Sequence, residues 1–195
     1  MEELNDFNEE KILEVRMYFF VPYNISEIQK GIQCGHAALR YARLYSADNP
    51  EVWDFVDNHE TWIILNGGTT NETRDFDGIA EGTLNQIADG LQENGTMFSY
   101  FIEPDLNNAL TSLCFLLDER VFNKKDYPDF IDYLITNHND VYVKKVNEKF
   151  KEMLNIGNLE ELAVEFPEEY KEWVRLLGGM KNVFLRELIK GKKLA

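Results

Sequence analysis

Residues 15–45 read VRMYFFVPYNISEIQKGIQCGHAALRYARLY, and this stretch decides which architecture the chain can adopt. Its first part, Val15–Val21, is rich in β-branched and aromatic residues and predicts a strand. Pro22 ends that strand because proline cannot donate a hydrogen bond to a sheet. Ser26 is a typical helix N-cap, and the residues after it predict a helix to about Leu44. A strand that runs directly into a helix indicates an α/β fold.

Two stripes of side chains follow the helical period in the predicted helix. The apolar stripe, which we expect to be buried, consists of Ile28, Ile32, Gly35, Leu39 and Ala42. The polar stripe, one residue further on, consists of Gln29, Gln33, His36, Arg40 and Arg43. Cys34 lies among small and apolar residues, and we expect a buried side chain there rather than a nucleophile. Chemistry on this helix would therefore use the polar stripe.

Strands and helices continue to about residue 122. Further strands are predicted at TWIILN, TMFSYFIEPD and SLCFLL, and a helix is predicted over 82–93. Right-handed crossover connections make the first two strands parallel. We therefore predict a three-layer α/β/α sandwich with a four-stranded mixed sheet over residues 15–122, preceded by an acidic segment, 1–14.

Residues 123–195 have a different character and predict a C-terminal helical extension. Helix-period segments are separated at 139–140, at Gly157 and at 178–179. The extension can pack on the sheet, cover a site as a lid, or form a homodimer through its helices. Its expected apolar anchors are Trp173, Leu176, Leu177, Phe184 and Leu188.

The acidic charge is concentrated in one part of the chain. The formal net charge is −15, and residues 1–122 carry all of it, with 7 Lys and Arg against 22 Asp and Glu, whereas residues 123–195 carry 13 of each. Such a surface repels phosphate backbones, so general duplex binding is not expected, and a nucleic-acid ligand would need a local basic pocket. Solubility explains this acidity more simply than mimicry of DNA does.

Metals, disulfides and membranes are not expected. Cys34 and Cys114 have no metal-ligand spacing, and the three histidines lie far apart. The acidic pair in the turn 75–78 lacks the further carboxylates of a calcium loop. No apolar run approaches the ~18 residues that span a bilayer, and the acidic N-terminus does not resemble a signal peptide, so we expect a cytoplasmic protein without a cofactor.

Residues 31–37 read GIQCGHA, and their Q-C-x-H-A pattern resembles the helix motif of the type-2 peptidyl-tRNA hydrolase family of archaea and eukaryotes. The order of the elements over about 15–122 is similar to that family as well. The chain departs from the family pattern at two places. The helix-start lysine of the family falls on Gln29, with Lys30 adjacent, and the D-A-G-x-T segment is replaced by residues 103–109.

The resemblance implies hydrolysis of the ester of peptidyl-tRNA or of a related nucleotide-linked substrate. This chemistry needs a polarised water and donors to an oxyanion. The implied catalytic residues are Lys30, Gln33, His36 and Asp105. The implied ligand-binding residues are Gln29, Gly67, Gly68, Thr69, Thr70, Asn107 and Asn108. A structural role for His36, fixing the helix to the last strand, remains open.

Two non-catalytic readings remain open. The chain also resembles acidic bacteriophage proteins of the same superfamily, which implies an anti-defence protein that sequesters a nucleotide signal or a host factor in the equivalent cleft, within the host cytoplasm. A protein inhibitor that presents its acidic surface to a basic host protein is the third class.

Overall fold

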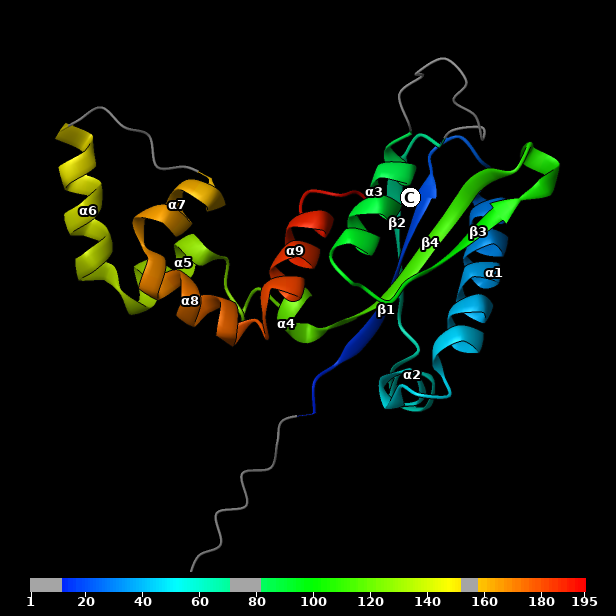
Figure 1. Ribbon diagram of the computed structural model, residues 1–195, viewed down its shortest axis with the longest axis horizontal. Helices are drawn as coiled ribbons and strands as arrows, with labels where there is room; N and C mark the ends of the chain where they lie inside the picture. Colours follow the sequence, from blue (N-terminus) through cyan, green and yellow to red (C-terminus); the bar gives the residue numbers. More distant parts are fainter. Residues whose placement is uncertain (1–11, 71–81, 152–157) are drawn as a thin grey trace, which may run out of the picture.

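A four-stranded mixed sheet forms the centre of the protein, as a computed structural model shows (Figure 1). The structure describes residues 12–70, 82–151 and 158–195. The strand order is β2-β1-β4-β3, with β1 Val15–Pro22, β2 Trp62–Gly68, β3 Ser99–Glu103 and β4 Ala109–Asp118. β1 and β2 are parallel, whereas β4 is antiparallel to both β1 and β3. The predicted α/β class, the mixed sheet and the parallel first pair are confirmed.

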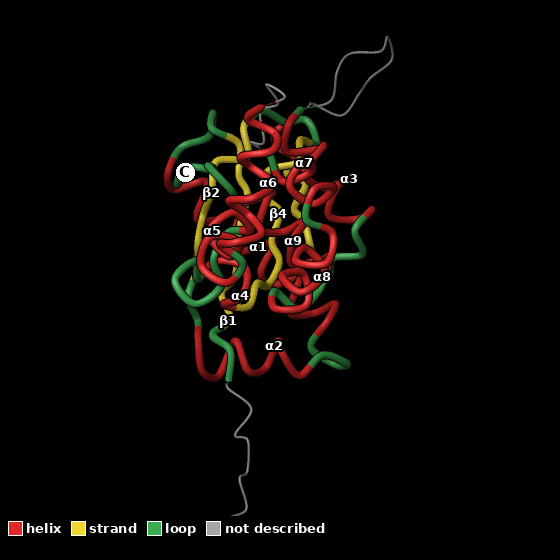
Figure 2. Tube along the Cα trace, turned by 90° about the vertical axis from the view of Figure 1, so that its left-hand side faces the viewer, coloured by secondary structure: helices red, strands yellow, loops and turns green. Residues whose placement is uncertain are grey.

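Helices cover both faces of the sheet, which makes the predicted three layers (Figures 1 and 2). One face packs against α1 Glu27–Tyr45, the short α2 Pro50–Asp54 and the π-helical turn Phe55–His59. The other face packs against α3 Thr83–Glu93 and α9 Met180–Ile189. Phe19 and Phe20 of β1 point to opposite faces, as successive strand residues must, and each is the centre of one apolar core.

α1 begins as predicted but faces the opposite way. Ser26 caps the helix and forms a capping box with Gln29. The apolar stripe that we expected to be buried is exposed, since Ile28 is 78% and Leu39 72% accessible. The buried side chains of α1 are Lys30, Gln33, Cys34, Ala37 and Tyr41. The expectation was wrong because periodicity identifies the faces of a helix, but the facing strands select which face they bind.

The extension forms a helical lobe with its own apolar core (Figure 1). The short α4 Glu119–Phe122 follows β4 and packs against the core of the sheet; the helices of the lobe are α5 Phe130–Asn137, α6 Asn139–Lys151, α7 Leu159–Glu165 and α8 Pro167–Leu176. Two predicted anchors, Trp173 and Leu177, are buried in this core, whereas Leu176 is exposed. Phe184 and Leu188 of α9 instead pack against the core of the sheet. The last helix therefore belongs to the α/β layers.

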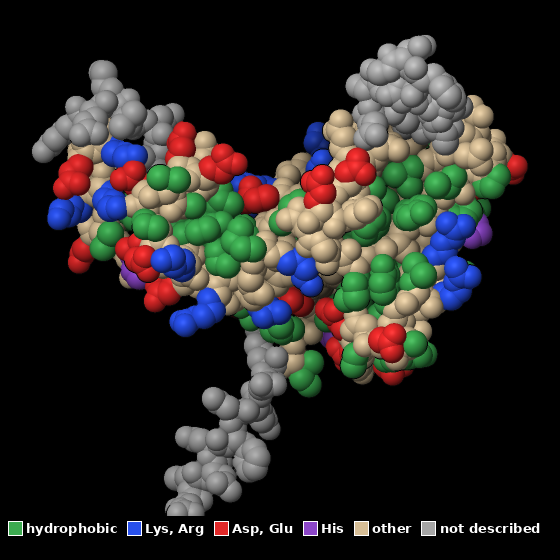
Figure 3. All heavy atoms as spheres, in the orientation of Figure 1, with side chains coloured by type: hydrophobic (Ala, Val, Ile, Leu, Met, Phe, Trp, Pro, Cys, Tyr) green, Lys and Arg blue, Asp and Glu red, His purple; other side chains and the backbone are tan. Residues whose placement is uncertain are grey.

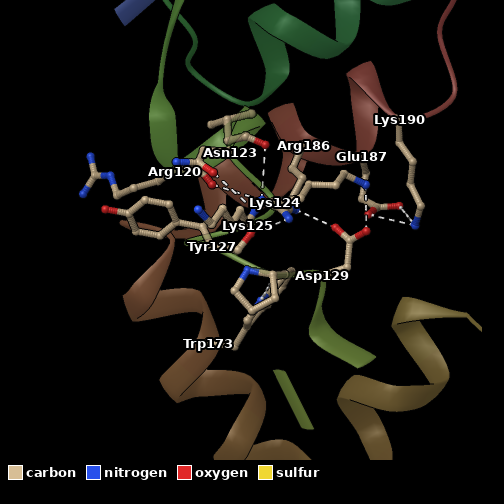
Figure 4. A network of polar contacts seen from close by, with 12 residues as sticks. Arg120, Asn123, Lys124, Lys125, Tyr127, Asp129, Trp173, Arg186, Glu187 and Lys190 are labelled. Carbon is tan, nitrogen blue, oxygen red and sulfur yellow. Dashed lines mark hydrogen bonds and ion pairs between the residues drawn. The ribbon is translucent and has the colours of Figure 1, made fainter. Parts of the chain in front are cut away.

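A buried arginine joins the helical lobe to the sheet domain (Figure 4). Arg186 of α9 donates to Asp129 and to the carbonyl oxygens of Arg120, Val121 and Tyr127. Beyond α9 the chain runs along the outer side of β2, where Asn66 and Ile64 form backbone hydrogen bonds with Lys193 and Ala195 respectively. These contacts fix the position of the extension and partly cover the β2 edge.

Several sequence expectations concern the ends of elements. The separation predicted at 178–179 lies between α8 and α9, whereas the one predicted at 139–140 occurs one residue earlier, at His138, since α6 begins at Asn139. The acidic turn 75–78, Gly157 and most of the segment 1–14 lie outside the described residues. Among the helices that are described, none combines the length and the apolar character needed to cross a bilayer.

Candidate functional site

A cleft opens where α1 begins, at the end of the sheet that carries the β3–β4 hairpin. It has a volume of about 430 Å³. We name it the helix-start cleft; its lining residues are Pro22, Asn24, Ile25, Thr70, Asp105, Leu106, Asn107, Ala109 and Thr111. Asp105 is the one ionisable side chain in this lining. The cleft is therefore suited to a polar, largely uncharged group.

A second hollow runs between α1 and β3 and has a volume of about 550 Å³. We name it the α1/β3 groove; its lining residues are His36, Leu39, Arg40, Arg43, Leu44, Phe98, Ser99, Tyr100 and Phe101. Figure 3 shows Lys or Arg side chains together with a histidine over this side of the molecule, at the right of the view. The groove combines cationic and aromatic groups, which is the chemistry that binds phosphates and bases.

The aromatic floor of the groove organises its cations. The His36 ring stacks on Phe101 at 4.4 Å between centroids, and the Arg40 guanidinium lies 4.7 Å from the same ring. Arg40 also donates to the carbonyl oxygen of Tyr100 at 3.1 Å. Within the described residues, neither Arg40 nor Arg43 forms an ion pair with a carboxylate. Their positive charges are therefore available to an anionic ligand.

A buried amide lies at the junction of the two hollows. Gln33 is 3% exposed, its side-chain N–H donates to Glu103 at 2.7 Å, and its carbonyl oxygen accepts from the Thr111 hydroxyl at 3.0 Å. The Thr111 oxygen is also 3.2 Å from the carbonyl oxygen of Phe101. Thr111 lines the cleft and Phe101 lines the groove, so this network connects the two.

Small polar residues of β3 and β4 contact the buried face of α1, which mixes polar and apolar side chains. Ser99 donates to the carbonyl oxygen of Ala37 at 2.5 Å, and Ser112 lies 3.9 Å from the Cys34 sulfur. These side chains, with Thr111, give the buried polar groups of α1 the partners that burial demands. The buried face of α1 therefore docks on the sheet with its polar groups paired at these positions.

Neither cysteine is suited to nucleophilic catalysis. Burial raises the pKa of the Cys34 thiol to about 11 and that of the Cys114 thiol to about 12. A thiol at such a pKa carries almost no thiolate at neutral pH. The expectation that Cys34 is a buried side chain is confirmed.

The structure brings some of the predicted site residues together and separates others. Asp105, Asn107 and Thr70 line the helix-start cleft, and Gln33 lies at its junction with the groove. Asn108 is exposed at the tip of the β3–β4 hairpin, where it and Asn107 adopt left-handed backbone angles. His36 lines the groove instead of the cleft, and it is exposed rather than part of the core.

Other predicted residues have structural partners elsewhere. Lys30 is buried and its ammonium pairs with Glu27 at 2.8 Å, so it does not line the cleft as described above. Gln29 closes the capping box of α1. Both side chains therefore bind to residues at the start of α1 and not to a ligand.

The turn after β2 does not present the free amides that a phosphate cradle needs. The backbone N–H of Gly68 donates to the Asn66 side chain at 2.8 Å, and that of Thr69 donates to the Thr83 hydroxyl at 2.9 Å. Gly67 is packed so closely that a Cβ there would lie 2.6 Å from Leu84. These residues fasten the start of α3 to β2, and of this predicted set only Thr70 reaches the cleft.

Sequence reasoning missed the strand residues of the site. Thr111 and Glu103 have no motif around them, and only their pairing with Gln33 identifies them. One signal could have located the groove: the chain has no acidic residue between Glu27 and Asp48, although its net charge is −15. Arg40 and Arg43 lie in that acid-free stretch.

The described residues contain no group of three or more His, Cys, Asp or Glu side chains placed to hold a metal ion. Comparison with known proteins adds no identification. Neither the protein-family models nor the curated protein sequences match this chain.

Proposed function

We propose that this protein hydrolyses the ester of a nucleotide-linked substrate of the peptidyl-tRNA type. The supporting observation is the continuity of the helix-start cleft and the α1/β3 groove through Gln33, Thr111 and Phe101. Because β3 and α1 run side by side, an extended substrate can place its nucleotide in the groove and its ester in the cleft.

The groove provides the recognition in this proposal. Arg40 and Arg43 attract phosphates, and the exposed ring of Tyr100 offers a surface for a base. These groups supply the local basic pocket that an acidic chain needs to bind a nucleic acid. A single-stranded acceptor end fits such a groove better than a duplex, which would meet the acidic surface around it.

The cleft provides the chemistry. The Asp105 carboxylate accepts a proton from a water molecule as that water attacks the ester carbonyl carbon. The side-chain N–H of Asn107, which lines the cleft, donates to the oxyanion that develops on the carbonyl oxygen, while the Thr111 hydroxyl stays bonded to Gln33. The bond between the carbonyl carbon and the ribose oxygen then breaks, and the proton returns to that oxygen. Gln33 and Glu103 position Thr111 and do not touch the substrate.

The test is release of the acyl group from N-acetyl-aminoacyl-tRNA under single-turnover and steady-state conditions. Asp105→Asn should lower kcat by about 100-fold or more, as expected for loss of a general base. Arg40→Gln with Arg43→Gln should raise KM by about tenfold with little change in kcat, because these side chains bind and do not react. Asp132→Asn, an exposed change on α5, is the matched control.

Equal kcat values for Asp105→Asn and the control would contradict the assignment of the base. Absence of hydrolysis by the wild-type protein would refute the hydrolase.

A second candidate is a non-catalytic protein that binds a nucleotide in the same groove. It is favoured by the pairing of Gln33, Glu103 and Thr111 with one another, since groups that already satisfy each other need no reaction to explain them. In this case fluorescence anisotropy with a labelled single-stranded oligonucleotide would show binding that depends on Arg40 and Arg43, and no product would form.

A further inference from the structure

The outward face of α1 is apolar and has no partner in the part of the chain that is described. Its side chains, which we name the outer stripe, are Ile28, Gly31, Ile32, Gly35, Leu39 and Ala42. In Figure 1, α1 lies at the right of the view, and none of the stripe residues is among its buried side chains. Exposed apolar residues in such number on one helix face need an explanation.

An apolar hollow continues the stripe toward β2. Its volume is about 440 Å³, and Ala38, Leu39, Ala42, Val56 and Trp62 are among its lining residues. Glu60 is the one charged residue in this lining. Ile28, Ile32, Leu39, Val56 and Trp62 are 41–78% exposed, which corresponds to on the order of 500 Å² of apolar surface. That is at the upper end of the apolar patches found on monomers.

The two glycines of the stripe are not required by the fold of the chain itself. A Cβ added at Gly31 or Gly35 would meet no atom within 4 Å, and neither residue has a positive φ. A glycine inside a helix costs about 1 kcal/mol relative to alanine. At these two positions no side chain separates the helix backbone from an approaching partner.

We propose that the outer stripe is the interface with a second copy of this chain, in which the two α1 helices pack antiparallel about a two-fold axis at Gly35. This arrangement places Leu39 of each copy at the level of Gly31 in the other. It also places Ile28 at the level of Ala42, and Ile32 at the level of Ala38. Every large side chain therefore meets a small one, which is the self-complementarity that a two-fold interface needs.

Area and charge both favour a second copy as the occupant. A two-fold contact buries the stripe and the hollow on both copies, so on the order of 1,000 Å² of apolar surface leaves water, which is the size that a specific interface needs. The segment between Glu27 and Asp48 has no acidic residue in a chain of net charge −15. The two α1 helices can therefore pack without bringing carboxylates together, and Glu60 is the one carboxylate in the lining of the hollow.

The cations of the groove remain accessible in this dimer, because they lie on the flank of α1 that faces β3, and Leu39 is the residue that the groove and the outer stripe share. The dimer does not depend on the proposed hydrolysis. It also differs from a dimer through the C-terminal helices, which uses another surface.

Sedimentation velocity of the full chain from about 1 to about 100 μM tests the proposal, because this range covers micromolar dissociation constants. The wild-type protein should sediment as a dimer at the high end. Ile32→Glu should sediment as a monomer throughout, with a dissociation constant at least about 100-fold weaker. Val164→Glu, on the exposed side of α7, adds the same charge to an even more exposed apolar position and should leave the dimer unchanged.

Cysteine cross-linking tests the position of the axis. Gly35→Cys should form an intermolecular disulfide on mild oxidation, because the two residues lie at the axis. Gly31→Cys is the matched control, since its two copies would be offset by ~12 Å along the helices, beyond the reach of a disulfide.

A monomer at every concentration would overturn the proposal and leave the face to a different protein or to a lipid surface. A dimer that Ile32→Glu does not weaken would show that the interface lies on another surface. Equal cross-linking of the two cysteine variants would exclude an axis at Gly35.

Discussion

α1 and α9 cover opposite faces of the same sheet, and Gln33 of α1 and Arg186 of α9 are both buried, but the two groups have different surroundings. Arg186 of α9 is 1% exposed, and its guanidinium donates to Asp129 and to three backbone carbonyl oxygens. Gln33 of α1 is 3% exposed and pairs with Glu103 and Thr111 where two hollows meet. Burial of a polar group alone therefore does not indicate a binding site. A binding site also needs an open hollow beside the buried group.

The apolar side chains of the two helices also lie on different sides relative to the sheet. α9 turns its large apolar side chains toward the sheet, where Leu185 is buried and Phe184 is partly buried. α1 turns Ile28 and Leu39 to the outside and Gln33 to the sheet. α9 is thus held by its apolar face together with a charge network, whereas α1 leaves its apolar face available.

The largest expected effect is at Arg186. Arg186→Met should lower the free energy of unfolding by about 3–5 kcal/mol, because it leaves Asp129 and three carbonyl groups without their buried donor. Urea unfolding followed by tryptophan fluorescence measures the loss, since Trp173 lies in the adjoining helical core. Arg175→Met, at an exposed position of α8, should change the stability by less than about 0.5 kcal/mol. Equal effects would show that the network does not hold the lobe.

The same network should make stability depend on acid pH. Burial alone would raise the pKa of Asp129, but hydrogen bonds from Lys124 and Arg186, together with their charges, lower it from its ordinary value of 3.8. A carboxyl with a lowered folded pKa contributes stability above the unfolded pKa and loses it as the pH falls through the folded value. The protein should therefore lose stability progressively below about pH 4.

Urea unfolding of Asp129→Asn across this range isolates the contribution. The variant should be less stable than the wild type at neutral pH and should lose less on acidification. Asp132→Asn, at an exposed position of α5, should keep the wild-type dependence. A wild-type slope in Asp129→Asn would place the acid sensitivity elsewhere.

The smallest effect is expected at Gln33. Gln33→Leu should cost about 1–2 kcal/mol, because Thr111 keeps the Phe101 carbonyl as a partner and water can reach the half-buried Glu103. Gln92→Leu, at an exposed position of α3, is the control. If Gln33→Leu lowers the free energy of unfolding as much as Arg186→Met does, Gln33 is a structural residue like Arg186, and the contrast between the two helices is weaker.

Part of the site could be predicted from local sequence. The Q-C-x-H-A pattern led to Gln33. The polar connection after Glu103 led to Asp105 and Asn107, and both of these line the cleft. Thr111 could not be found in this way, because its role depends on a partner 78 positions away in the sequence. The groove depends in the same way on residues of α1 and β3 that only the fold brings together.

The sequence by itself determined the elements of this protein: the β1 strand, the cap at Ser26, the parallel first pair of strands and the helical character of the extension. These follow from local propensity and from the handedness of crossovers, which need no distant partner. Only the tertiary structure decided which face of α1 is buried. Ser99, Thr111 and Ser112 offer hydrogen bonds to the face that carries Gln33, Cys34 and Ala37, and polar groups with such partners can be buried while an apolar stripe remains in water.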